Sequence, residues 1–330
     1  ILLFYILKQL IAPFTLFINF ANNLNPGHGD VMQLWHTLLP INKATALFSA
    51  FFIPLLSTIS LVPLYFSAKT LYGTRVAQRS IFLFFFIPTI VFFIPINDAF
   101  LHLFSITAFF FLLKGLEKNQ KISFFLSGVF LLLGIFFNLS LLPILLLLFI
   151  FALLFLRYKK AALLNNYLTA GIFFSLGVFL PLFFLNLFFH FNLIQVMHTI
   201  TTHAPGNLGR SYPLWLYFNI QDFLIFCGIP IALIFLLMIK KFFLQIIKNQ
   251  LTAIDPLFVA FFMMIIVINF SGFVLGETGR LWSPYIPFMV LITVSFVTSK
   301  LKFSNKLFVG ILILQIIQLL VMQEFWVMLW

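Results

Sequence analysis

Two long apolar runs, PLFVAFFMMIIVINFSGFV at Pro256–Val274 and PYIPFMVLITVSFVTS at Pro284–Ser299, flank the stretch Gly276-Glu277-Thr278-Gly279-Arg280-Leu281-Trp282. Each run is about as long as a helix that crosses a bilayer, and helices are one of only two backbone forms that can do so. The stretch between them places an acid and a base three residues apart, in a chain of which only 8% is charged. The pattern predicts two spanning helices joined by a polar loop at the membrane surface, with Trp282 in the headgroup layer.

Two interpretations of this loop stay open. Arg280 and Glu277 form a binding point for an anionic, lipid-borne ligand, with Arg280 on phosphate and Glu277 orienting it or its reaction partner. Alternatively, the pair only ties the loop together, and Trp282 is an interfacial anchor. The remaining polar residues of the chain favour the first interpretation.

Composition sets the class of protein. The chain is 63% hydrophobic with a mean hydropathy of +1.17, against roughly 45–50% apolar residues in soluble domains. A net charge of +12 would suggest nucleic acid in a soluble protein, but here the basic residues gather in short loops between apolar runs, so no nucleic-acid partner is expected. Cys227 is the single cysteine, which excludes a disulfide framework and a cysteine metal site. We predict an all-α, polytopic transmembrane bundle that forms one domain over residues 1–330.

Hydropathy predicts about eleven spans, two pairs of which turn tightly at Pro95-Ile96-Asn97 and Asn138-Leu139-Ser140. The chain starts inside an apolar run, so we expect it to continue upstream of Ile1. The predicted spans are Ile1–Phe20, Ala44–Ser67, Ser80–Ile96, Asp98–Leu113, Ile122–Phe137, Leu141–Leu156, Tyr167–Phe189, Asp222–Ile239, Pro256–Val274, Pro284–Ser299 and Leu307–Met322.

Charge predicts the orientation of these spans. Alternate loops hold three basic residues each, so five loops contain fifteen of the nineteen in the chain. By the positive-inside rule, these five loops are cytoplasmic. The acids Asp30, Asp98, Asp222 and Glu277 and all six histidines then fall on the outer half. We expect the loops at 21–43, 190–220 and 275–283 to form the face that holds the site.

Asp98 and His102 are the first candidate pair, because residues four apart share one face of a helix. Asp98 would act as a base or as a metal or sugar ligand, with His102 as its partner. The alternative is that Asn97 or Asp98 caps the helix. In the first outer loop, Asp30 with His28 beside it is a second candidate carboxylate, or Asp30 caps a short amphipathic helix.

The long outer loop supplies Arg210, Tyr212 and Trp215, a set that suits phosphate and sugar rings because arginine pairs with phosphate and aromatic faces pack on sugars. Alternatively, the segment that contains these residues is amphipathic and lies in the membrane interface. His198 and His203 lack a third nearby ligand, so no metal site is expected there.

Three features together resemble the GT-C class of multi-spanning membrane glycosyltransferases, which take sugars from polyprenyl-phosphate carriers. One is a polar first outer loop with Asp30, followed by a span ending in Leu71-Tyr72-Gly73-Thr74-Arg75. The others are the run Pro88…Pro95-Ile96-Asn97-Asp98 and the late loop Gly276–Trp282 with Pro284 and Pro287 behind it.

The resemblance implies inverting transfer of a sugar from a polyprenyl-phosphate donor to a glycan, lipid or protein acceptor, on the outer face of a bacterial cytoplasmic membrane. It implies a carboxylate of the first outer loop as the general base, which Asp30 matches, and Asp98 is the second expected catalytic residue. Arg280 or Arg210 would stabilise the leaving phosphate, and a divalent metal is compatible with the reaction without being required. The expected substrate-binding residues are His28, His102, Arg210, Tyr212, Glu277, Arg280 and Trp282.

Two other classes of protein stay open. A transporter or flippase of a lipid-linked or anionic solute would need polar residues along a path through the spans, where the sequence offers only scattered Asn, Ser, Thr and Gln. A non-enzymatic subunit of a cell-envelope complex would tolerate alanine at the outer acids.

Overall fold

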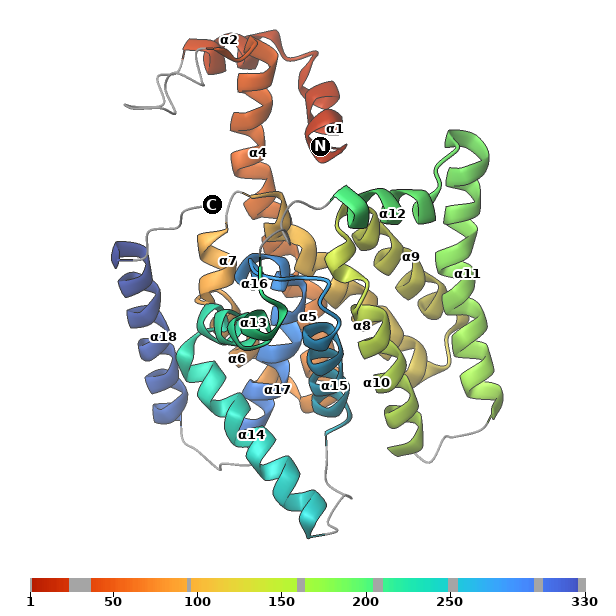
Figure 1. Ribbon diagram of the computed structural model, residues 1–330, viewed down its shortest axis with the longest axis vertical. Coiled ribbons are helices and arrows are strands. Elements are labelled where there is room, and N and C mark those ends of the chain that lie inside the picture. Colours follow the sequence, from red (N-terminus) through yellow and green to blue (C-terminus); the bar gives the residue numbers. More distant parts are fainter. Residues whose placement is uncertain are drawn as a thin grey trace.

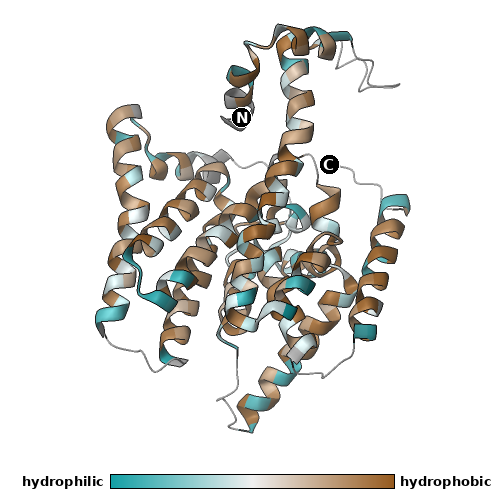
Figure 2. Cartoon of the chain, turned by 180° about the vertical axis from the view of Figure 1, so that it is seen from behind, coloured by the Kyte–Doolittle hydropathy of each residue, from teal (hydrophilic) through white to brown (hydrophobic). Residues whose placement is uncertain are grey.

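The computed structural model describes residues 2–23, 37–93, 96–158, 164–203, 210–248, 255–299 and 305–325. Every regular element in these ranges is a helix, as the apolar sequence predicts (Figure 1). Hydrophobic residues extend along the length of the helices, and hydrophilic residues concentrate towards their ends (Figure 2). The prediction of a helical membrane bundle is confirmed at this level.

The α-helices of the first half are α1 (Leu2–Ile11), α2 (Thr15–Asn23), α4 (Pro40–Ile59), α5 (Leu61–Tyr72), α6 (Thr74–Phe84), α7 (Pro88–Phe92), α8 (Leu101–Lys118), α9 (Lys121–Phe137) and α10 (Ile144–Tyr158). Those of the second half are α11 (Leu164–Phe189), α12 (Leu193–His203), α13 (Tyr212–Cys227), α14 (Ile229–Ile247), α15 (Pro256–Phe270), α16 (Thr278–Leu281), α17 (Ile286–Ser299) and α18 (Asn305–Phe325). Three 3-10 turns are η1 (Asn97–Phe100), η2 (Leu139–Leu141) and η5 (Ser283–Tyr285).

Six segments of the described chain are long and apolar enough to cross a membrane, and three further apolar helices are shorter. The prediction of eleven spans is therefore supported only in part. The six are Pro40–Tyr72, Asp98–Lys118, Leu139–Arg157, Asn165–Phe188, Ile229–Ile247 and Asn305–Phe325; the shorter ones are Lys121–Phe137, Pro256–Phe270 and Ser283–Thr298.

Helix α17 is the centre of the bundle. Its residues from Ile286 to Val294 are almost completely buried, and it packs against α5, α6, α8, α14 and α15. Phe288 meets the ring of Phe109 on α8 edge-on at 5.3 Å. Because α17 follows directly after α16 and η5, the bundle core fixes one end of the loop that contains Glu277 and Arg280.

In addition to Ala44–Ser67, which contains parts of α4 and α5, three predicted spans are not single α-helices. Ile1–Phe20 divides into α1 and α2 around Pro13, and Ser80–Ile96 divides into α6 and α7 before Pro88, since proline cannot donate the backbone hydrogen bond that a helix interior needs. The third, Asp222–Ile239, is interrupted at Gly228, whose φ of +104° suits only glycine.

Two glutamines of α18 form hydrogen bonds with backbone groups on both sides of the break at Gly228. Gln315 Nε2 donates to the carbonyl of Cys227 at 3.1 Å, and Gln318 Nε2 donates to that of Ile225 at 2.9 Å. Gln318 Oε1 also accepts from the amide of Ile229 at 2.6 Å. Unpaired backbone groups are costly inside a bilayer, so these side chains allow α13 to lie crosswise to its neighbours.

The two ends of the bundle differ in chemistry. The ends of α5, α8, α14 and α18 that bear Lys69, Lys118, Lys248 and Lys306 lie at one end, while α16 and α7 lie towards the other (Figure 1). Helices α1 and α2 with the first part of α4 extend beyond that second end. Glu277 and Arg280 are thus separated from the basic loops by the length of the spanning helices.

This arrangement predicts the labelling of cysteines in intact cells. With Cys227 first replaced by alanine, a membrane-impermeant maleimide should label Ser211→Cys directly, but Lys118→Cys and Lys248→Cys only after the membrane is opened, since basic loops stay in the cytoplasm. All three positions are exposed. If Lys118→Cys and Lys248→Cys were labelled from opposite sides of the membrane, the prediction that both lie at the cytoplasmic end of the bundle would be wrong.

Candidate functional site

Arg280 lies between two carboxylates. Its Nη2 pairs with Glu277 Oε2 at 2.5 Å, and its Nε lies 3.3 Å from Asp98 Oδ2. The side chains of Arg280, Asp98 and Glu277 are 29%, 17% and 31% exposed, respectively. The cluster is therefore shielded enough to strengthen its electrostatic interactions, yet open to a ligand. We call these three residues the acid–arginine cluster.

Asp98 is held by a neighbouring hairpin. Its Oδ1 accepts a hydrogen bond of 2.9 Å from Asn138 Nδ2, in the turn between α9 and η2. The backbone carbonyl of Asp98 accepts from the hydroxyl of Ser283, which follows α16. The carboxylate of Asp98 contacts other segments, and no amide of the helix that follows is recorded as its partner in the described chain, although Asp98 lies in the first turn of η1.

A tight backbone turn aims Glu277 at Arg280. Gly276 has a φ of +104°, and Glu277 has a φ of +56°, which is uncommon for a residue with a side chain. Asn219 of α13 supports the turn: its Oδ1 accepts from the amide of Gly276 at 3.1 Å, and its Nδ2 donates to the carbonyl of Val274 at 2.8 Å. The backbone carbonyl of Asn219 accepts from Thr278 Oγ1 at 3.0 Å.

Arg210 contacts the same loop from the other side. Its Nη1 donates to the carbonyl of Leu275, and its guanidinium lies 5.0 Å from the ring centre of Trp215. Among the described residues, no carboxylate is recorded as a partner of Arg210. Arg210 and the acid–arginine cluster together bring two cations and two carboxylates to one loop.

The position of Gly276 gives a direct test of this loop. A Cβ at Gly276 would collide with Arg210 Nη1 and approach Trp215, and the positive φ adds strain. We expect Gly276→Ala to lower the melting temperature by several degrees, since strain and overpacking cost about 1–3 kcal/mol. Gly171→Ala in α11 is the control, because a Cβ there meets nothing within 4 Å. Equal melting temperatures for the two variants would contradict the described loop.

The structure brings together Asp98, Glu277, Arg280 and Arg210, and it corrects two other predictions. His102 is fully buried and contacts the hydroxyl of Ser57 at 3.1 Å, so it is not the partner of Asp98. The reason is η1: Asp98 lies in a 3-10 turn, which changes the angular spacing to a residue in the α-helix that follows.

Trp282 is also misplaced by the prediction. It is fully buried, against Phe223 at 5.3 Å and Tyr285 at 6.1 Å between ring centres, rather than in the headgroup layer. A short polar stretch predicts a surface position, but here the chain turns inward immediately after Arg280. Tyr212 is exposed, and its hydroxyl donates to the carbonyl of Phe270 at 2.7 Å. His28 and Asp30 lie outside the described residues.

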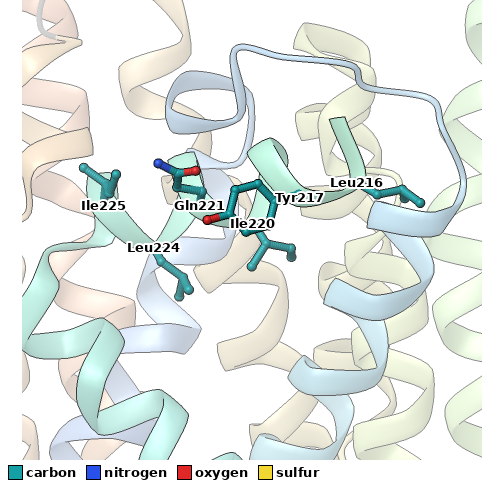
Figure 3. A pocket seen from close by; sticks show the side chains of 6 residues that line it. All are labelled: Leu216, Tyr217, Ile220, Gln221, Leu224 and Ile225. Atoms are coloured by element: carbon teal, nitrogen blue, oxygen red, sulfur yellow. The ribbon is translucent and has the colours of Figure 1, made fainter. Parts of the chain in front are cut away.

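An apolar groove lies on the face of α13 turned away from the loop (Figure 3). It has a volume of about 420 Å³. Asn219 and Phe223 occupy the opposite, buried stripe of the same helix. One helix therefore supports the site loop with one face and offers an apolar surface with the other. The groove is lined by Leu216, Tyr217, Ile220, Gln221, Leu224 and Ile225.

Asn138 and Asn219 are the site residues that sequence reasoning did not single out. The sequence marks Asn138 only as a turn residue, and Asn219 lies one helical turn before Asp222 in an apolar helix. An amide side chain inside such a helix is the signal that could have identified Asn219, because buried polar groups need partners. In the part of the chain that is described, no group of three or more His, Cys, Asp or Glu residues could hold a metal ion.

No protein-family model, no curated protein and no solved structure matches this chain. Fold and site define a polytopic helical membrane protein with an acid–arginine cluster at the end of the bundle opposite its basic loops. Its function is inferred from these residues alone.

Proposed function

We propose that the protein is a membrane glycosyltransferase that moves a sugar from a polyprenyl-phosphate carrier to an acceptor on the outer face of the membrane. One observation carries the proposal: Arg280, bound to both Asp98 and Glu277, lies at the end of the bundle away from the basic residues. A carboxylate can take the proton of the acceptor and a cation can stabilise the leaving phosphate, so the two groups together support sugar transfer from a lipid phosphate.

The chemistry assigns a task to each kind of group. An oxygen of the acceptor attacks the anomeric carbon of the sugar, and the bond from that carbon to the phosphate oxygen breaks. The electron pair of that bond leaves with the polyprenyl phosphate, and the acceptor's proton passes to a carboxylate. Asp98, or Asp30 of the first outer loop, is the proposed base. Glu277 holds Arg280 in place beside Asp98.

Arg210 is the proposed contact for the phosphate, in addition to Arg280. Arg280 is already bound to two carboxylates, so the three groups of the acid–arginine cluster sum to one negative charge when ionised. That sum would repel a phosphate in the absence of a further cation. Arg210, which reaches the same loop without a recorded carboxylate partner, supplies that charge.

The groove on α13 suits the isoprenoid chain of the donor. It is lined mainly by aliphatic side chains, and its helix directly supports the loop that contains Glu277. Because Arg210 lies two residues before the start of α13, a lipid chain that runs along the groove towards that end of the helix would bring its phosphate towards Arg210.

The role of Arg210 leads to a binding prediction. Arg210→Gln should weaken binding of polyprenyl monophosphate by about tenfold or more, since a hydrogen bond to a charged group contributes roughly 1.5–3 kcal/mol. Lys248→Gln removes an equal charge at the opposite end of the bundle and should bind normally. Titrations in lipid nanodiscs measure the affinity of both variants for polyprenyl monophosphate. Equal affinities would exclude Arg210 from the phosphate site.

A test of the function itself uses the purified wild-type chain in nanodiscs. Polyprenyl monophosphate and a polyprenyl alcohol of the same length are titrated separately, and their affinities are compared. We expect clear preference for the phosphate, because two arginines lie at the site. Equal affinity for the alcohol and the phosphate would contradict recognition of a phosphate-linked donor.

A further inference from the structure

Arg79 is an arginine that the proposed function does not use. It lies on α6 at the basic end of the bundle, and only 8% of the residue is exposed. Its Nη1 donates to Thr298 Oγ1 at 3.0 Å, and its Nη2 donates to Asn305 Oδ1 at 2.8 Å. Its guanidinium lies 5.1 Å from the ring centre of Phe308. Arg79 thereby joins α6 to the end of α17 and the start of α18.

All the recorded partners of Arg79 in the described chain are neutral. Arginine stays protonated in proteins, and a buried charge is costly unless it meets an opposite charge. The carboxylate of Asp255 accepts from the hydroxyl of Tyr72 at 2.6 Å and from the amide of Leu257 at 2.9 Å, and it is not recorded as a partner of Arg79. The positive charge of Arg79 therefore has no countercharge among its recorded contacts.

Other positive groups surround this position. Arg75 lies one helical turn before Arg79, and burial together with Arg75 lowers the pKa of Arg79. Helix α18 begins at Asn305 with no acidic residue in its first turn, and the dipole of a helix favours an anion at its start. Lys306 follows in the same turn and is exposed. These four features place excess positive charge where α6 meets α18.

The start of α18 is open to its surroundings, because Asn305 and Lys306 are exposed. Only 17% of the apolar window of α18 is buried within the molecule, so most of that helix faces its surroundings. The positive-inside rule then places its first residues near the headgroups on the basic side of the membrane. That side attracts anionic lipids through its basic residues.

We propose that Arg79 and Arg75, with the start of α18, form a binding site for the phosphate of an anionic phospholipid on the cytoplasmic side. The phosphate provides the countercharge that Arg79 lacks, and the acyl chains lie along α18. The site is at the opposite end of the bundle from the acid–arginine cluster and does not depend on the proposed sugar transfer.

Native mass spectrometry of the whole chain in detergent tests the site, with phosphatidylglycerol and phosphatidylcholine of identical acyl chains as probes. We expect the wild type to prefer phosphatidylglycerol, and Arg79→Gln to bind it about tenfold more weakly, as loss of a charged hydrogen bond implies. Lys118→Gln, which removes an exposed charge from another basic loop, should bind like the wild type. Unchanged affinity in Arg79→Gln, or an equal loss in Lys118→Gln, would overturn the proposal.

Two further arms complete the test. Arg75 is exposed, so Arg75→Gln should fold normally and show a smaller loss than Arg79→Gln. If Arg79→Gln does not fold, unchanged lipid affinity in Arg75→Gln overturns the site. Inorganic phosphate at millimolar concentration should not displace the lipid; full displacement would show a site for a soluble anion and overturn the lipid assignment.

Discussion

Replacing Arg280 with alanine should reduce sugar transfer by about a hundredfold or more, the usual cost of removing one donor from a site where negative charge develops. The same change leaves the carboxylates of Asp98 and Glu277 facing each other without the cation that now separates them. We therefore also expect a loss of stability of about 1–3 kcal/mol. Arg280→Lys keeps the charge but cannot bind both carboxylates in the same fork, so its losses should be smaller.

A double-mutant cycle tests the coupling between Asp98 and Arg280 directly. If Asp98 and Arg280 are coupled, adding Asp98→Asn to Arg280→Ala should recover part of the lost stability, because it removes one unpaired carboxylate. The interaction energy should lie at about 0.5–3 kcal/mol, the range for residues in contact. Melting temperatures of the two single variants and the double variant measure it. Strict additivity would contradict the ion pair between Arg280 and Asp98.

Asp98→Asn should lower sugar transfer by at least about tenfold, the minimum expected for loss of a general base, with little change in melting temperature. The amide keeps an acceptor for the hydrogen bond from Asn138, and Arg280 retains Glu277 as a partner. Stability is thus spared while proton transfer is lost. Rates measured with saturating donor, alongside thermal unfolding, separate the two effects.

Asn138→Ala is the informative comparison for Asp98→Asn. It removes the donor to Asp98 and the side chain that accepts from the amide of Ser140 at 2.9 Å, so both stability and activity should fall. Full activity in Asp98→Asn would leave Asp98 as a structural partner of Arg280 and assign the base elsewhere.

Much of the fold could be predicted because it depends on local patterns. Apolar runs predict helices, and the turn between α9 and α10 occurs at Asn138–Ser140, as expected. The pairing of Glu277 with Arg280 was also predictable, because three residues separate them in the chain. Both features require only neighbours in sequence.

What could not be predicted depends on contacts between distant residues. Nothing in the sequence states that Arg280 reaches Asp98, since that contact joins segments 182 positions apart through the packing of α8, α9 and α17. The break at Gly228 is a similar case, because its cost is offset by Gln315 and Gln318 of α18. An apolar run alone predicts one continuous span, without the break.

The most direct test of the proposed sugar transfer is turnover by the purified chain in liposomes. A panel of polyprenyl-phosphate sugars is supplied with membrane-extract acceptors, and polyprenyl monophosphate is measured by mass spectrometry as the common product. We expect the wild type to release polyprenyl monophosphate from at least one donor. Asp98→Asn should release about tenfold less or lower still. Equal release by the wild type and Asp98→Asn, or transbilayer movement of the donors without release, would contradict the proposed sugar transfer.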